Sequence, residues 1–76
     1  MAAKRSPANQ ALGRTLRSAR AQRGYSQEAF AHRCGLDRAN YGAIERGEFN
    51  VTVDTIVKLA AGLQISAGEL LGRAGL

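Results

Sequence analysis

Apolar residues recur at helical spacing in several separate stretches of the chain, and polar or glycine-containing turns lie between them. The first of these stretches carries Leu12, Leu16 and Ala19. Its opposite face carries Arg14 and Arg17, which we expect on a solvated surface. Ser6 supplies a helix cap and Pro7 fits the first helical position, so the first helix is predicted to begin there and to stop near Gly24.

Residues 26–46 carry two short helical patterns joined by a turn at Gly35. Their apolar or small positions are Phe30, Ala31, Cys34, Leu36, Tyr41 and Ile44. These positions can pack over one another only if a helix over about 27–33 turns sharply at Gly35 into a second helix over about 38–46, capped by Asp37. A short glycine-containing turn between two helices is the unit that presents its second helix to the major groove of DNA.

Two further helices are predicted in the last third of the chain. Thr52 caps the first, and the inner stripe of that helix consists of Ile56, Leu59, Ala60 and Leu63. Ser66 and Glu69 have the spacing of a capping box, which predicts a short fifth helix that ends near Gly72. The sequence therefore predicts an all-α, compact bundle of five short helices.

The length of 76 residues fits one domain, which we place at 6–76 after a flexible basic arm at 1–5. The net charge of +5 favours polyanionic partners, because Lys and Arg attract phosphate and release its condensed counterions. We see no signal peptide and no apolar run long enough to span a bilayer, so the expected location is the cytoplasm, without a membrane partner.

Little in the composition favours catalysis or a cofactor. The single cysteine, Cys34, cannot form an internal disulfide, which is typical of a reducing compartment. One histidine, His32, together with Cys34 cannot fill a four-coordinate metal site, and it leaves little for acid–base chemistry. We therefore expect no enzyme activity, no catalytic residue, no metal and no cofactor.

The candidate recognition helix begins after Asp37. On one side it would carry Arg38, Ala39, Gly42, Ala43 and Arg46, opposite Tyr41 and Ile44. Small residues let a helix sit deep in a groove, where Arg38 can reach the paired acceptors of guanine and Ala39 or Ala43 can meet a thymine methyl. Asn40 has two open roles: contact with a base or phosphate, or a bond back toward Asp37. The alternative is an ordinary solvated face.

Four residues are candidates for contact with the DNA backbone. Ser26 and Gln27 lie at the start of the second helix, where backbone N–H groups and short polar side chains can bind phosphate. Ser26 would cap the helix as well. Arg46 and Asn50 follow the recognition helix and are the other two candidates.

In order and spacing, the chain resembles the lambda-repressor-like helix-turn-helix (XRE-type) family from about residue 12 to 71. The residues that carry the resemblance are Leu16 and Arg20, Ser26-Gln27-Glu28, Ala31, Gly35-Leu36, the run from Tyr41 to Gly47, and the run from Thr55 to Ala60 with Leu63. Within the family, the segment GLDRANYGAIERGEFNVT looks most like the controller proteins of restriction-modification systems. Phage repressors and small antitoxins share the same scaffold.

The resemblance also implies roles for single residues. Arg38, Ala39 and Ala43 align with base-contacting positions of the family. Several members carry glutamine where Ala39 or Ala43 stands, so specificity here would lean on Arg38 and on the deformability of the DNA. Arg20 and Glu45 match a pair that forms a partly buried salt bridge between the first and third helices.

Family members dimerise through the region that corresponds to about 63–73 here. The resemblance therefore assigns Ile65, Leu70 and Leu71 to a dimer interface, while Leu70 also partly closes the core of the single chain. Two-fold pairing would place two recognition helices roughly 34 Å apart on a near-palindromic operator.

The function implied is that of a cytoplasmic, homodimeric, sequence-specific transcription regulator that binds double-stranded DNA. Controller proteins commonly bind their own promoter, and they repress by blocking RNA polymerase or activate by touching it. The alternatives are a small antitoxin that neutralises a toxin partner and a phage-type repressor. Such antitoxins usually need an extra segment that covers the toxin.

Overall fold

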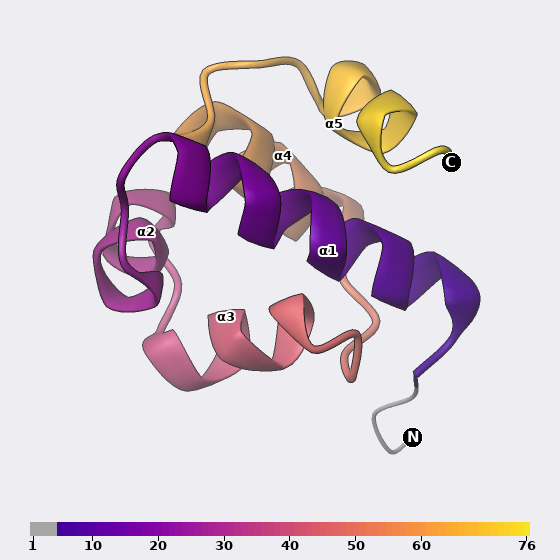
Figure 1. Ribbon diagram of the computed structural model, residues 1–76, viewed down its shortest axis with the longest axis horizontal. Helices are drawn as coiled ribbons and strands as arrows, with labels where there is room; N and C mark the ends of the chain where they lie inside the picture. The colour runs from indigo at the N-terminus through magenta and orange to yellow at the C-terminus, as the bar shows by residue number, and fades with distance from the viewer. Residues whose placement is uncertain (1–4) are drawn as a thin grey trace.

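The computed structural model describes residues 5–76, which form five helices joined by short turns (Figure 1). The helices are α1 (Pro7–Gln22), α2 (Gln27–Cys34), α3 (Arg38–Glu45), α4 (Val53–Gly62) and α5 (Ala67–Arg73). No strand occurs in this part of the chain. The all-α five-helix prediction is confirmed. Most of the observed helix ends lie within one residue of the predicted ends. Residues 1–4 of the predicted arm lie outside the described part.

Every helix begins directly after the polar residue that the sequence predicts as its cap. The caps are Ser6, Ser26, Asp37, Thr52 and Ser66, and each side chain accepts a backbone N–H from the first turn of its helix. These bonds satisfy donors that have no partner inside the helix. At the other end of α2, Gly35 takes a left-handed conformation with φ of 75°, which residues other than glycine rarely adopt. This turn aims α3 away from α2.

The core lies between α1, α2, α3 and α4, and α5 closes one end of it. In Figure 1, α1 crosses in front of α4, with α3 below it and α2 at the left. The buried apolar side chains come from all five helices: Leu12, Leu16, Ala19, Phe30, Ala31, Cys34, Tyr41, Ile44, Leu59, Ala60, Leu63 and Leu70. The rings of Phe30 and Tyr41 meet edge to face with centroids 5.3 Å apart. The predicted inner stripes are thus the ones that pack.

Leu70 belongs to this core completely. Its exposed fraction is 0%, whereas its neighbour Leu71 and the preceding Ile65 are half-buried. The assignment of Leu70 to a dimer interface is therefore wrong, because its side chain leaves no surface for a partner. Its place is explained by the packing of α5 on α4 and α1.

Gly13 lets α1 approach the end of α3 more closely than any other residue would. A Cβ atom at this position would overlap the carbonyl oxygen of Glu45 and lie 2.7 Å from that of Ile44. Both obstacles are backbone atoms, which cannot move without shifting α3. The contact between α1 and α3 therefore depends on the missing side chain.

We expect Gly13→Ala to lower the free energy of unfolding by about 1–3 kcal/mol, because overpacking displaces backbone. Chemical denaturation of the purified variant measures this. Gly72→Ala is the matched control, since a Cβ there meets nothing within 4 Å and alanine favours a helix. Equal stability of the two variants would show that α1 and α3 can separate at no cost.

Candidate nucleic-acid interface

One buried carboxylate, that of Glu45, joins α1 to the two helices of the predicted helix-turn-helix, α2 and α3. Arg20 of α1 donates to both of its oxygens, from Nε to Oε2 at 2.6 Å and from Nη2 to Oε1 at 3.2 Å. Gln27 of α2 donates from Nε2 to Oε1 at 2.9 Å, and the Tyr41 hydroxyl of α3 donates to Oε2. The predicted salt bridge between Arg20 and Glu45 is confirmed.

The charges of this network are stabilised in the folded chain. Burial is the largest influence on the pKa of Glu45 and raises it, but the hydrogen bonds from Arg20, Tyr41 and Gln27 together bring that pKa below its ordinary value. The hydrogen bond to Glu45 likewise raises the pKa of Arg20. Burial, followed by the bond to Glu45, raises the pKa of Tyr41, which keeps its proton. The pair is therefore ionised and the tyrosine neutral.

The first turn of α3 is exposed and presents the predicted base-contacting side chains. Asp37 Oδ1 accepts the backbone N–H groups of Ala39 at 2.8 Å and of Asn40 at 3.3 Å, which fixes where the helix begins. Arg38, Ala39 and Asn40 are all exposed. The bond from Asn40 to Asp37 is made by its backbone, and its side chain remains at the surface. Ala43, one turn further on, is half-buried.

Gly42 does not belong to this exposed stripe, contrary to the prediction. It is buried, and a Cβ atom there would lie 3.2 Å from Arg46 Nη1 and 3.9 Å from Gln27 Oε1. The side chains of Arg46 and Gln27 cover it because both lie against this part of α3. The open surface of α3 is therefore concentrated in its first turn.

Ser26 and Gln27 lie at the start of α2, beside α3. Ser26 is exposed and its Oγ accepts the N–H of Ala29 at 3.0 Å, so it caps the helix as predicted. The side-chain amide of Gln27 is bound to Glu45 within the chain. Contact of either residue with phosphate stays a prediction.

Arg46 and Asn50 lie just after α3 and also have partners inside the chain. Arg46 Nε donates to Glu48 Oε1 at 3.1 Å, in an exposed ion pair. Asn50 Oδ1 accepts from Asn9 Nδ2 of α1 at 2.6 Å. The structure brings both residues to the α3 side of α1, and their contact with phosphate stays a prediction.

Sequence reasoning did not find the full set of donors around Glu45. Tyr41 stands four residues before Glu45 on the same helix, and a buried tyrosine hydroxyl usually needs a partner, so that bond had a readable signal. Gln27 reaches the carboxylate from another helix, and no spacing along the chain indicates this.

No group of histidine, cysteine and acidic side chains that could hold a metal occurs within residues 5–76. Burial raises the pKa of the Cys34 thiol to about 11, so this residue is an apolar part of the core. None of the described helices has the length and apolar character needed to cross a membrane.

Residues 16–70 match the helix-turn-helix family (HTH_3). The chain belongs to this family. Control protein C.SmaI of Serratia marcescens is 43% identical over 65 residues, which cover 86% of this chain and 77% of that protein. The resemblance that the sequence suggests, to controller proteins within this family, is thus confirmed.

Two further proteins show how far the likeness extends. A hypothetical transcription factor of Neisseria meningitidis is 42% identical over 60 residues, which cover 79% of this chain but 57% of that longer protein. The crystal structure of the restriction-modification controller protein C.AhdI from Aeromonas hydrophila is 44% identical, with a TM-score of 0.78. That match covers 82% of this chain and 94% of C.AhdI. These relatives are named as regulators, not as enzymes.

We expect Glu45→Gln to lower the free energy of unfolding at pH 7 by about 3 kcal/mol, because it leaves the Arg20 charge buried without its partner. The pKa of Glu45 is lowered on folding, so its stabilising effect is present above its ordinary value of 4.5 and is lost as the pH falls through the folded value. The stability gap between wild type and variant should therefore narrow in acid. Thermal unfolding from pH 7 to pH 3 measures it.

The matched control is Glu69→Gln, which removes an exposed ion pair with Arg73 on α5. Its stability should stay close to that of the wild type across the same range, because such pairs contribute little. A gap for Glu45→Gln that is constant with pH would contradict the ionised pair.

Proposed function

We propose that this chain is a cytoplasmic, homodimeric, sequence-specific DNA-binding transcription regulator of the restriction-modification controller type. The observation that supports this best is the exposed first turn of α3, which carries Arg38, Ala39 and Asn40 in a helix-turn-helix chain related to control proteins. The positive net charge supports the same partner, because DNA is a polyanion.

Base recognition falls to the first turn of α3. In helix-turn-helix proteins the N-terminal residues of the second helix contact base edges in the major groove. Arg38 has a guanidinium that matches the two acceptors of guanine, and Ala39 is small enough to let the helix approach and to meet a thymine methyl. Asn40 is exposed beside them and can reach adenine. Ala43 contributes its remaining exposed surface further along the helix.

The hydrogen-bond network around Glu45 fixes the orientation of α3 for base recognition. The network fixes α3 to α1 through Arg20 and to α2 through Gln27. The start of α2 therefore keeps a constant position relative to the first turn of α3. Backbone phosphates bound by Ser26 and by the segment after α3, with Arg46 and Asn50, would then set the register of Arg38 on the bases. Ordered side chains in this place reduce the conformational entropy that binding costs.

A single recognition helix of eight residues reaches only a few base pairs, so specificity requires a second copy. Ile65 and Leu71 are half-buried apolar residues at and near α5, which makes them the candidates for a two-fold contact. The dimer would occupy a near-palindromic operator in the promoter of its own gene. Occupancy represses by excluding RNA polymerase or activates by contacting it.

We expect Arg38→Ala to remove about 1–3 kcal/mol of preference for the operator, because the paired contact to guanine is lost. Fluorescence anisotropy with promoter DNA of its own gene and with a scrambled duplex measures the difference. Arg23→Ala is the matched control, since Arg23 is an exposed arginine outside the α3 surface. An equal loss on both duplexes would exclude base recognition by Arg38.

We expect Leu71→Glu to convert the protein to a monomer, because a charge would be buried in the two-fold contact. Sedimentation velocity measures the oligomeric state, and thermal unfolding checks that the monomer still folds. Val57→Glu is the control on α4, where the side chain is 51% exposed in the single chain. Should Val57→Glu rather than Leu71→Glu dissociate the protein, the interface lies on α4.

A further inference from the structure

Arginines from three segments of the chain line one surface hollow beside α1. The hollow has a volume of about 330 Å³, is open to solvent, and is lined by Arg5, Gln10, Arg14, Arg17, Glu45 and Arg46. Gln10, Arg14 and Arg17 recur at helical spacing on α1, whereas Glu45 and Arg46 come from the end of α3. The hollow therefore lies where α1 meets α3.

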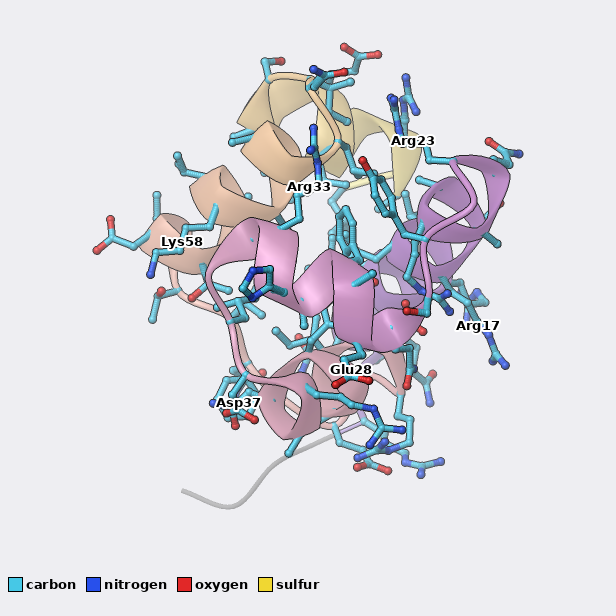
Figure 2. The ribbon with its side chains drawn as sticks, turned by 90° about the vertical axis from the view of Figure 1, so that its left-hand side faces the viewer. Arg17, Arg23, Glu28, Arg33, Asp37 and Lys58 are labelled. Carbon is cyan, nitrogen blue, oxygen red and sulfur yellow. The ribbon has the colours of Figure 1, made fainter. Side chains whose placement is uncertain are left out.

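Two of these arginines have no acidic partner within residues 5–76. Both Arg14 and Arg17 are exposed, and neither forms an ion pair in the described part of the chain. Figure 2 shows the Arg17 side chain pointing outward into solvent. The fold gathers both of them with Arg46 and Arg5 around one hollow.

The charge around the hollow is strongly positive. Glu45 is already neutralised by Arg20, which lies behind it, and Glu48 bridges Arg5 at 2.5 Å and Arg46 at 3.1 Å. The four arginines and one glutamate of the lining, together with Arg20 and Glu48, leave an excess of three positive charges. This concentration attracts an anion from a distance and favours a partner with phosphate groups.

The position of the hollow selects the source of the phosphate. The eight residues of α3 span about 12 Å, which is close to the width of the major groove of DNA. With the first turn of α3 against the bases, its last residue comes to the rim of the groove, where the phosphates run. Arg46 follows that residue directly, and the hollow opens beside it.

We propose that the hollow formed by Arg14, Arg17 and Arg46, with Arg5 at its edge, binds phosphodiester groups of the same DNA that α3 reads. This inference rests on the proposed function and extends it, because it adds α1 to the DNA-binding surface. Arg14 and Arg17 contact the backbone and no base, so they raise affinity for every sequence alike. A hollow that is open to solvent suits a continuous strand better than an enclosed small molecule.

The test is the double substitution Arg14→Gln and Arg17→Gln, measured by anisotropy on promoter DNA and on a scrambled duplex over a range of salt concentrations. The variant should bind both duplexes at least about 10-fold more weakly than the wild type at about 0.1 M salt. The magnitude of the slope of log K against log salt should fall by about 1–2. Arg23→Gln is the matched control, because Arg23 follows the C-terminal end of α1, does not line the hollow, and points outward in Figure 2. It should leave both quantities unchanged.

Three outcomes would overturn the inference while leaving the proposed function intact. The first is wild-type affinity and salt slope in the double variant. The second is a loss confined to promoter DNA, which would make the arginines part of base recognition. The third is full DNA affinity together with loss of a binding response to inorganic phosphate in NMR titration, which would assign the hollow to a free anion. If the wild type binds neither duplex, the proposed function fails as well.

Discussion

The structure depends on the ionised carboxylate of Glu45, held among donors from three helices. An isolated buried charge would be strongly unfavourable, but here Arg20, Gln27 and Tyr41 all donate to it. No buried side-chain N or O atom within residues 5–76 is left without a hydrogen-bond partner. Because the donors lie on α1, α2 and α3, the network defines one relative arrangement of those helices rather than simply adding stability.

That arrangement is reinforced sterically at the same place. Gly13 allows the backbone of α1 to touch the last carbonyl groups of α3, next to the Glu45 side chain that Arg20 binds. A close backbone contact and a buried ion pair at one junction leave little freedom for α3 to rotate. The base recognition that we propose for α3 needs this rigidity, since a small tilt of α3 would move its first turn relative to the base pairs.

The sequence predicts well what depends on neighbours along the chain. All five caps and the left-handed Gly35 turn follow from local chemistry, and the inner stripes follow from helical spacing. The Arg20–Glu45 salt bridge is predicted by the family resemblance and not by spacing along the chain. Gly42 is buried, contrary to the prediction, because Gln27, fifteen positions away in the sequence, and the Arg46 side chain lie over it. The gathering of Arg14 and Arg17 with Arg46 likewise exists only once α1 is packed on α3.

The predicted phosphate-contacting residues differ in how easily they can turn toward DNA. Arg46 shares Glu48 with Arg5 in an exposed cluster, and hydrogen bonds from those two arginines lower the pKa of Glu48, so it stays charged. Exposed ion pairs of this kind contribute little to stability, so a phosphate can replace Glu48 as the partner of Arg46 at small cost. Gln27 differs, because turning its amide away would remove a donor from the buried Glu45 carboxylate. Of these two side chains, Arg46 is therefore the one that can leave its partner in the chain at small cost, while Gln27 is held by the Glu45 carboxylate.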